Sequence, residues 1–345
     1  MKKKKTRVGI LTAGGDCPGL NAAIRGVGKT AILHYGMEVV GISSGFLGLI
    51  NNEVVNLDEQ TLSGILSQGG TILGTSREKP FKEDNFSQSI NKPKLMKKHY
   101  DELGLDCLVC IGGNGTQKTA ALLSENGMNI IGIPKTIDND VWGTDITFGF
   151  DSAVNIATDA IDRLYTTANS HKRIMVIEVM GNNAGWLALY SGIAGGGDVI
   201  LIPEIDYDIN VVADYLVKNT YKKKHSSIVV VAEGIKTPEG KKKKNAASYI
   251  SKKINEITGI ETRETILGYI QRGGSPSPMD RVLATQYGAF AAQLIDEKKF
   301  GVMVAMKKGK IESVPLIEVG GKTRIIDINH SLIKKARYME TSFGN

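Results

Sequence analysis

The sequence predicts an α/β fold in which mostly parallel strands alternate with helices. Short apolar runs recur along the chain, and each is followed by a glycine-containing turn and then by apolar residues at helical spacing. Polar signatures repeatedly follow the apolar runs, at the strand ends where open α/β sheets bind their ligands. The 345 residues suffice for about two domains, and any boundary falls inside the alternation because no linker-like segment interrupts it.

The first half is expected to contain two strand–loop–helix units. Ala23, Val27, Ala31 and His34 recur at helical spacing and predict a buried helix face. A proline is expected in the first turn of the helix over 93–103. The predicted strands are 8–12, 37–42, 107–111 and 129–133, the predicted helices 20–35, 62–66 and 93–103, with a glycine-rich bend at 43–49 and a loop or short strand at 69–77.

The second half continues the alternation and closes with a hairpin. Apolar residues at 153, 156, 157, 160, 161 and 164 make the segment 151–169 an amphipathic helix. The other predicted helices are 184–193, 210–221, 246–257, 279–295 and 331–338; the predicted strands are 174–179, 199–202, 228–232 and 261–267, with the hairpin at 302–306 and 310–315.

The charge pattern argues against nucleic-acid and membrane partners. Much of the formal charge of +7 comes from lysine clusters at 2–5, 222–224 and 241–244. Like-charge runs of this kind are typical of solvated loops, and a nucleic-acid surface would interleave aromatic residues, whereas only Tyr221 adjoins these clusters. No segment approaches the length of a membrane span, and the apolar run 8–13 is too short for a signal peptide. We therefore expect a cytoplasmic protein.

The three cysteines argue against a disulfide scaffold. Cys107 and Cys110 form a C-x-x-C pattern, which is a redox motif in some proteins. Here the pattern lies inside an apolar strand, so buried, unreactive thiols are favoured over a redox pair. Cys17 lies in a glycine turn, where an exposed thiol is possible.

The segment 107–140 carries the strongest chemical signal. An apolar strand leads directly into Gly112-Gly113-Asn114-Gly115-Thr116 and a helix start. Glycine lets backbone N–H groups approach an anion, and a helix N-terminus adds partial positive charge. The next strand delivers Asp138 and Asp140 beside this phosphate cradle. Two such carboxylates indicate a base for a hydroxyl, a metal ligand, or both, and hence phosphoryl transfer.

A second strand–glycine-loop–helix unit lies near the N-terminus, at Gly14-Gly15-Asp16. It matches neither G-x-G-x-x-G nor a P-loop, so it supports neither a nicotinamide nor a Walker-type site, and a simple tight turn stays an alternative. Arg77 follows two glycines and a Thr-Ser pair. It is either a solvent-exposed side chain or a planar donor over a phosphate.

Four motifs in order resemble the 6-phosphofructokinases, with features of a mixed-substrate branch. They are the segments 14–26, 134–140, 178–181 and 268–276, and the similarity runs from about residue 8 to about residue 300. The glycine loop at 112–116 alone also resembles NAD and diacylglycerol kinases, which lack the other three motifs.

The resemblance implies two similar Rossmann-like three-layer domains with the active site in the cleft between them. The larger, donor-binding domain would be discontinuous, comprising 1–149 and about 271–321, followed by a C-terminal helix and tail at 322–345. The sugar-phosphate domain would span 150–270. The substrates would be fructose 6-phosphate and ATP. A homotetramer, or alternatively a dimer, would have Arg173 and Arg263 acting across a subunit interface.

The resemblance also implies roles for individual residues. Asp138 matches the base that takes the proton of the sugar 1-hydroxyl, Thr136 contacts the transferring phosphate, and Arg77 and Arg173 stabilise its charge. The implied substrate ligands are Thr136, Ile137, Asp138, Asp140, Arg173, Met180, Gly181, Asn182, Glu233, Arg263, Tyr269, Ile270, Gln271 and Arg272. The implied donor pocket consists of Gly15, Arg77, Glu78, Gly113, Asn114, Gly115 and Thr116.

Several positions depart from the family pattern. Asn114 stands where the family usually has an Asp that works with Mg²⁺, and the amide keeps an oxygen ligand but loses a charge. Gly115 leaves room for a nucleotide, whereas pyrophosphate users commonly carry Asp at that position. Lys135 and Tyr269 resemble the pyrophosphate branch. Since Gly115 decides whether ATP fits, we expect ATP as donor, with a pyrophosphate-dependent enzyme and a weakly active regulatory paralogue as alternatives.

Overall fold

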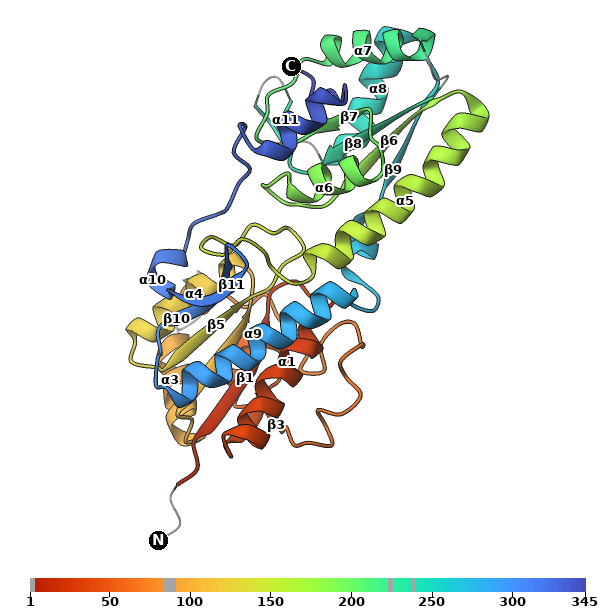
Figure 1. The fold of residues 1–345 in the computed structure, drawn as a ribbon. Coiled ribbons are helices and arrows are strands. Elements are labelled where there is room, and N and C mark those ends of the chain that lie inside the picture. The colour runs from red at the N-terminus through yellow and green to blue at the C-terminus, as the bar shows by residue number, and fades with distance from the viewer. Residues whose placement is uncertain (1–3, 83–90, 223–225, 238–239, 243) are drawn as a thin grey trace. The chain divides into compact units, whose positions relative to one another are not determined.

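The computed structural model describes residues 4–82, 91–222, 226–237, 240–242 and 244–345. The chain forms two compact units (Figure 1). Unit 1 comprises Met1–Thr136, Val141–Gly149 and Arg272–Thr323, and unit 2 comprises Ile137–Asp140, Phe150–Gln271 and Arg324–Asn345. Of the C-terminal segment 322–345, which the sequence analysis set apart, Arg324–Asn345 belongs to unit 2.

Unit 1 contains a seven-stranded sheet among its described residues, in the order β11-β10-β5-β4-β1-β2-β3. Its interior pairs are parallel, and the edge strands β3 and β11 run antiparallel to their neighbours. The strands are β1 (Arg7–Ala13), β2 (Glu38–Ile42), β3 (Val54–Asn56), β4 (Cys107–Gly112), β5 (Ile130–Pro134), β10 (Val302–Lys307) and β11 (Lys310–Pro315).

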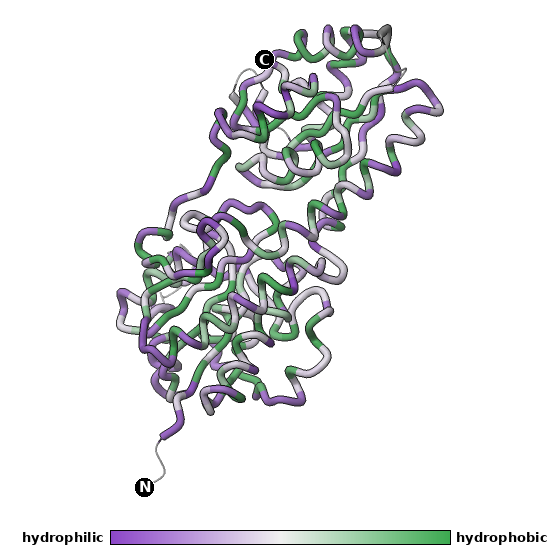
Figure 2. The backbone as a smooth tube through the Cα atoms, viewed as in Figure 1, coloured by the Kyte–Doolittle hydropathy of each residue, from purple (hydrophilic) through white to green (hydrophobic). Residues whose placement is uncertain are grey.

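Helices cover both faces of this sheet. Helices α1 (Leu20–Lys29) and α9 (Pro278–Asp296) pack against each other on one face. The opposite face packs on α2 (Phe46–Asn51), α3 (Lys92–Glu102), α4 (Asn114–Glu125) and α10 (Leu316–Val319), which share one apolar cluster with the sheet. Apolar residues gather along the central strands (Figure 2), because strands covered on both faces bury both sets of side chains.

Unit 2 is a second α/β unit with a four-stranded parallel sheet in the order β7-β8-β6-β9. Helices α5 and α6 pack together beside the sheet, as do α7 and α8. The elements are α5 (Phe150–His171), β6 (Ile174–Val179), α6 (Trp186–Ala194), β7 (Val199–Leu201), α7 (Ile209–Lys222), β8 (Ser227–Ala232), α8 (Ala246–Thr258), β9 (Thr262–Ile266) and α11 (Ser331–Tyr338). The predicted α/β class with mostly parallel sheets is confirmed.

Three local predictions differ from the structure, and two short elements were not predicted. The segment 62–66 is a turn rather than a helix, because Gly64 adopts a φ of 75° that ends any helix there. The predicted bend at 43–49 contains the start of α2, whose Phe46 and Leu49 are buried one turn apart. The helix that begins at Leu20 changes to a π-helical turn at Thr30–His34, and this change leaves His34 exposed. The two short elements β3 and α10 gave no recognisable pattern.

The structure confirms the prediction for Cys107 and Cys110 but not the exposed thiol considered for Cys17. Cys107 and Cys110 are buried, as predicted. Cys17 is also buried, contrary to an exposed thiol, because its Sγ lies against the carbonyl of Phe148 at 3.8 Å and the backbone of Gly149 packs on it. Burial raises the pKa of Cys17 to about 12, so this thiol is not a nucleophile at neutral pH.

The described residues of the lysine clusters are solvent-exposed, as predicted: Lys4, Lys5, Lys241, Lys242 and Lys244. Lys2, Lys3, Lys223, Lys224, Lys243 and the side chain of Lys222 lie outside the described residues. Among the helices that the structure describes, none has the length and apolar content needed to cross a bilayer.

The contact between α1 and α9 depends on Gly26 and Gly288, where an added Cβ would meet the backbone of the other helix. A Cβ on Gly288 would lie 2.6 Å from the carbonyl oxygen of Ala23 and 2.6 Å from the amide nitrogen of Val27. Such backbone atoms cannot move aside without shifting a helix. We expect Gly288→Val to lower the free energy of unfolding by about 1–3 kcal/mol. Urea unfolding followed by circular dichroism measures this change.

The matched control is Gln286→Ala, two residues away on the exposed face of α9. It should alter stability by less than about 0.5 kcal/mol. Equal midpoints for the valine variant and the wild type would contradict the proposed close packing.

Candidate active site

In unit 1, three loops converge where β1, β4 and β5 end. The amide of Gly14 donates to the carbonyl of Ser76 at 2.9 Å, and the hydroxyl of Thr75 donates to the carbonyl of Gly14 at 2.7 Å. The hydroxyl of Thr116 donates to the carbonyl of Ala13 at 3.2 Å. The loop before Arg77, the loop after β1 and the start of α4 are therefore tied into one group.

Two cations flank the glycine loop after β1. The ammonium group of Lys135, a buried residue, donates to the carbonyl of Gly15. A Cβ on Gly15 would lie 1.6 Å from Nη1 of Arg272, so the guanidinium group occupies the space beside this glycine. Positive charge next to exposed backbone amides is what an anionic ligand requires.

Helix α4 presents its N-terminus at the same place. Gly113 precedes the helix in an extended conformation without a side-chain cap, and Asn114 is the first helical residue. The first amides of a helix have no intrahelical acceptors, so this end is suited to a phosphate. Gly115 is exposed and has open space around its Cβ position.

A buried glutamine that the sequence analysis missed fixes this arrangement. Gln117 Nε2 donates to the carbonyls of Gly112, at the end of β4, and Ile133, in β5, at 2.9 and 3.0 Å. Gln117 is fully buried. Its two hydrogen bonds satisfy the buried Nε2 group and hold the ends of β4 and β5 in register. The only signal in the sequence was a polar residue one turn into the helix.

Other donor-pocket candidates lie at the edge of this group. Arg77 is exposed, directly after Ser76, whose carbonyl binds the β1 loop. Glu78 forms an ion pair of 3.0 Å with Lys92, so its carboxylate is partly neutralised. Thr136 ends the unit 1 group, and its carbonyl accepts a hydrogen bond of 2.8 Å from the buried hydroxyl of Thr147.

In unit 2, a second group forms at the carboxyl ends of β6 and β8. The amide of Met180 donates to Gln271 Oε1 at 3.3 Å, and the amide of Asn182 donates to Glu233 Oε1 at 2.8 Å. Gly181 lies buried between them. Tyr269 and Ile270, just before Gln271, are 72% and 60% exposed. The structure thus brings Met180, Asn182, Glu233 and Gln271, all predicted for the sugar pocket, together from three separate segments of the chain.

The predicted base belongs to unit 2 as well. Asp138 is half-buried, Asp140 is buried, and Asn139 between them has a φ of 51°. The amide and guanidinium groups of Arg324 bind the carbonyls of Asp140 and Asn139. Thr136, which belongs to the unit 1 group, and Asp138, which belongs to unit 2, are therefore only two residues apart in the chain.

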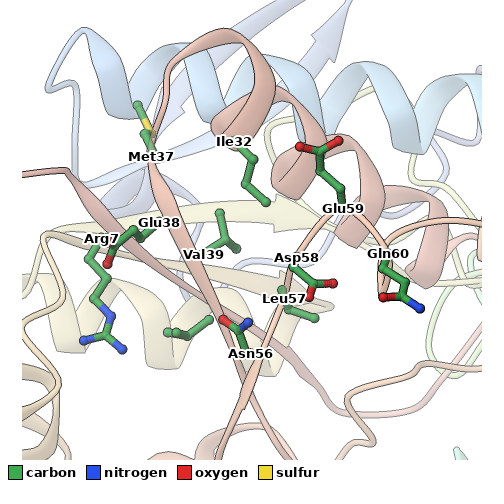
Figure 3. Close-up of a pocket in the computed structure, with 11 residues that line it drawn as sticks. Arg7, Ile32, Met37, Glu38, Val39, Asn56, Leu57, Asp58, Glu59 and Gln60 are labelled. Carbon is green, nitrogen blue, oxygen red and sulfur yellow. The ribbon is translucent and has the colours of Figure 1, made fainter.

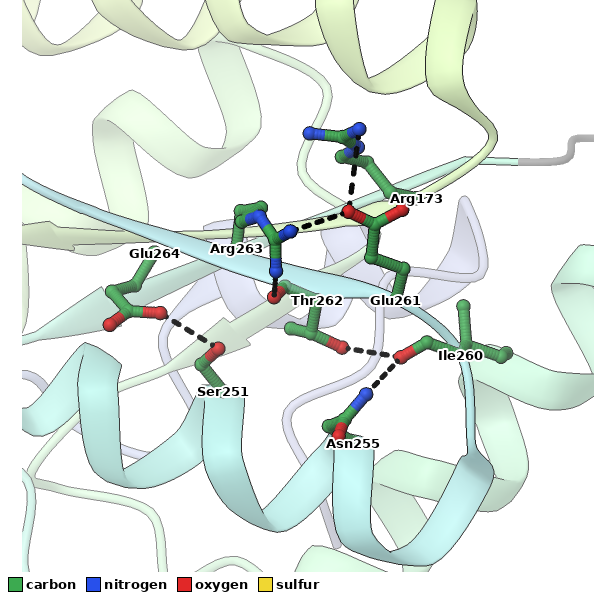
Figure 4. A network of polar contacts seen from close by, with 8 residues as sticks. All are labelled: Arg173, Ser251, Asn255, Ile260, Glu261, Thr262, Arg263 and Glu264. Carbon is green, nitrogen blue, oxygen red and sulfur yellow. Dashed lines mark hydrogen bonds and ion pairs between the residues drawn. The ribbon is translucent and has the colours of Figure 1, made fainter.

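Two predicted arginines lie near the amino ends of strands in the unit 2 sheet, opposite the carboxyl ends that carry the second group. Arg173 precedes β6, and Arg263 is the second residue of β9; Glu261 pairs with them at 3.4 and 2.8 Å (Figure 4). Strands advance about 3.3 Å per residue, so Arg173 lies roughly 20 Å along β6 from Met180. Within one chain, the structure does not bring these arginines to the other sugar-pocket residues.

A cavity of about 400 Å³ in unit 1 lies elsewhere, between β2 and the segment after β3 (Figure 3). Glu38, Asp58 and Glu59 line it together with Arg7. Hydrogen bonds from the amide and hydroxyl of Thr61 lower the pKa of Asp58. This concentration of carboxylates disfavours an anionic ligand, so we place the phosphate chemistry at the strand ends instead.

Comparison with known proteins shows the family to which the chain belongs. The family model described as phosphofructokinase matches residues 7–295. The chain is 60% identical to ATP-dependent 6-phosphofructokinase 3 of Bacteroides thetaiotaomicron, over 98% of this chain and all of that protein. It is 53% identical to ATP-dependent 6-phosphofructokinase of Spirochaeta thermophila, over the full length of both. The chain belongs to the phosphofructokinase family.

Solved structures support the same fold. Phosphofructokinase from Saccharomyces cerevisiae superposes with a TM-score of 0.84 at 31% identity, over 91% of this chain and 45% of that one. Pyrophosphate-dependent phosphofructokinase from Nitrosospira multiformis gives a TM-score of 0.86 at 20% identity, over 99% and 93% of the two chains. The latter likeness is one of fold alone.

The buried carboxyl of Glu178, at the end of β6, gives a pH prediction. It accepts a hydrogen bond of 2.9 Å from the amide of Ala247. Burial, with the charge of Glu233 adding to it, raises the pKa of Glu178 above its ordinary value. The group therefore stabilises the fold fully only below its ordinary pKa, and this contribution is lost as pH rises through the raised value.

Glu178→Gln keeps the acceptor and removes the charge. We expect its stability relative to wild type to increase between about pH 5 and about pH 8, as measured by urea midpoints. Glu256→Gln is a control without a pH trend in this range, because a hydrogen bond from Lys253 lowers the pKa of exposed Glu256 and its contribution to stability changes only below its ordinary pKa. A difference between the Glu178 variant and wild type that does not change with pH would refute the assignment.

Proposed function

We propose that this chain is an ATP-dependent 6-phosphofructokinase, which phosphorylates fructose 6-phosphate at its 1-hydroxyl to give fructose 1,6-bisphosphate in glycolysis. The observation that carries the proposal is the grouping of Lys135, Arg272 and the N-terminus of α4 around the glycine loops, with Lys135 three residues before Asp138 in the chain. Relatives at 60, 53 and 47% identity, matched along almost their full length, bear this name.

In the proposed reaction, Asp138 accepts the proton of the sugar 1-hydroxyl. The oxygen attacks the γ-phosphorus, and the bond from that phosphorus to the bridging oxygen breaks to release ADP. Phosphoryl transfer needs positioning and charge stabilisation more than covalent chemistry. Thr136, Arg77 and the α4 amides are suited to hold the transferring group and its neighbours.

The sugar phosphate is assigned to the unit 2 group. Met180, Gly181 and Glu233 lie at the carboxyl ends of β6 and β8, with Asn182 hydrogen-bonded to Glu233. Asp140, Tyr269, Ile270 and Gln271 complete the proposed pocket, to which Ile137 contributes backbone. Arg272 lies beside Gly15 in unit 1, so its cation belongs to the glycine-loop group as well.

Mg²⁺ belongs to this proposal. Among the described residues, no cluster of three or more acidic, histidine or cysteine side chains forms a ready-made metal cage. Mg²⁺ in kinases commonly takes one or two protein oxygens together with substrate phosphates, and the residues at the strand ends fit that mode. Asn114, with Asp138 or Asp140, would hold the ion, which neutralises developing charge on the phosphates.

ATP is favoured over pyrophosphate as the donor. The open space at Gly115 admits a nucleotide. Lys135, which suggested pyrophosphate use, holds the carbonyl of Gly15, a structural task that either donor allows. The 20% identity to pyrophosphate-dependent enzymes supports the fold and not the donor.

The arginine pair suggests an assembly. Arg173 and Arg263 both form ion pairs with Glu261 near the amino ends of the unit 2 strands. In the proposed assembly they contact a second copy of the chain from there. We therefore propose a homotetramer, with a dimer as the simpler alternative, in which these arginines bind the neighbour's sugar phosphate. A cytoplasmic location, where glycolytic intermediates occur, completes the proposal.

The first functional prediction concerns the base. Asp138→Asn should lower kcat about 10²- to 10⁴-fold with little change in KM for fructose 6-phosphate, because the amide keeps the shape and cannot take a proton. A coupled assay with ATP and Mg²⁺ measures it. Asp159→Asn, an exposed aspartate on α5 paired with Arg163, serves as control. Turnover at the wild-type rate in the Asp138 variant would exclude this base.

The second concerns donor choice. Gly115→Asp places a carboxylate beside the donor phosphates, and like charges about 4 Å apart cost about 4 kcal/mol at an effective dielectric near 20. We expect ATP use to fall about 10³-fold. Gly115→Ala adds volume without charge in open space and should keep ATP kinetics. Equal losses in both variants would attribute the effect to size and remove the electrostatic argument.

A further inference from the structure

The turn that carries Asp138 is held by the C-terminal segment of the chain. Residues Ile137–Asp140 belong to unit 2, although the chain on both sides of them belongs to unit 1. Asn139 has a φ of 51°, a conformation that asparagine tolerates and that persists where the surroundings fix it. The position of the Asp138 carboxyl thus depends on what binds this short turn.

Arg324 binds the turn through two groups. Its amide donates to the carbonyl of Asp140 at 2.7 Å, and its Nη1 donates to the carbonyl of Asn139 at 2.9 Å. These are the two carbonyls directly after Asp138. Two bonds from one residue to successive peptides fix both the place and the tilt of the turn.

The same arginine is fastened to the loop of the proposed sugar pocket. Its guanidinium carbon lies 4.0 Å from the centroid of the Trp186 ring, and Trp186 Nε1 donates to the carbonyl of Arg324 at 3.2 Å. Trp186 is buried and is the first residue of α6, directly after the loop that carries Met180 and Asn182. Cation–π stacking and the hydrogen bond restrict the guanidinium plane.

A half-buried carboxylate reinforces the connection. Glu204 accepts hydrogen bonds from the amide of Gly185, just before Trp186, at 3.0 and 3.1 Å, and from the amide of Ile326 at 3.1 Å. His330 meets the Trp186 ring edge-on, with centroids 5.5 Å apart. The segment 324–330 is therefore anchored at three points to the carboxyl end of the unit 2 sheet.

We propose that Arg324 is a positioning residue for the proposed phosphoryl transfer, which fixes the turn of Asp138 to the Trp186 end of the sugar-pocket loop. Its bonds to the turn go to the backbone carbonyls of Asn139 and Asp140. Orienting the base is worth a large factor in rate, since a misplacement of about 1 Å costs about 10²-fold in enzymes. The inference rests on the proposed function, because it assigns Asp138 as the base.

The test compares Arg324→Ala with a matched control. Arg337→Ala removes an arginine from the same segment that also contacts an aromatic ring, Phe343 at 5.6 Å, and bonds to Asn345. We expect Arg324→Ala to lower kcat about 10- to 10²-fold with KM for ATP within about twofold, and Arg337→Ala to change neither constant. Arg324→Lys should recover only part of the loss, because an ammonium group cannot stack and reach Asn139 together.

A second variant separates positioning from simple destabilisation. Trp186→Phe keeps an aromatic ring under the guanidinium group and loses the bond to the Arg324 carbonyl, so a loss of a few-fold in kcat is expected. If Arg324 and Trp186 act as one unit, the double variant Arg324→Ala with Trp186→Phe should be no slower than Arg324→Ala alone. Fully additive losses would overturn the coupling.

Hydrogen exchange gives a readout that needs no turnover. Amides in peptides covering 137–142 should exchange at least about tenfold faster in Arg324→Ala than in wild type or Arg337→Ala, with β4 unchanged. Wild-type kcat and wild-type exchange in Arg324→Ala would overturn the inference. Wild-type protein that phosphorylates nothing with ATP would instead refute the proposed function, and the exchange measurement would then decide the holding role by itself.

Discussion

Parallel pairing forces several strands to end at one level, and the candidate site is a consequence of that constraint. In unit 1, Ala13 of β1 pairs with Gly112 of β4, which pairs with Pro134 of β5. Three loops therefore start side by side, although nearly 120 residues of chain separate the first from the last. The amides of α4, the Lys135 ammonium and the Arg272 guanidinium then lie around the glycine loops, an arrangement that suits an anionic ligand.

The same parallel register also places residues of the unit 2 group side by side. Val179 of β6 pairs with Ala232 of β8, so Met180 and Glu233 emerge together, and Gln271 reaches back to bind the first of them. The acidic character of this group, with Glu178 buried behind Glu233, suits hydroxyl recognition rather than phosphate binding. Arg173 and Arg263, the cations proposed to bind the sugar phosphate, pair with Glu261 near the amino ends of β6 and β9. Under the proposed function a single chain would therefore hold only part of the sugar-phosphate site, which is the physical reason for proposing an assembly.

The turn Ile137–Asp140 connects the two groups along the chain, and the C-terminal segment holds it. Without outside partners the backbone of a four-residue turn could shift and carry the Asp138 carboxylate with it. Arg324 holds the backbone of the turn with two hydrogen bonds, and its guanidinium group is itself stacked on the Trp186 ring. The arrangement also gives residues after the closing hairpin a task that sequence motifs did not reveal, since none of the family-like motifs lies beyond residue 300.

Local spacing alone determined the alternation of strands and helices, the buried Cys107 and Cys110, and the residues of the glycine loops, because these depend on neighbours within a few positions. It failed where distant groups decide: Phe148 buries Cys17 from 131 residues away, and Gln117 joins two strand ends. The family-like motifs named Arg173 and Arg263 as ligands, but only the strand register places them far from Met180. Likewise, Trp186 and Arg324 stand 138 residues apart in the chain, and no periodicity encodes such a contact, since tertiary packing alone brings them together.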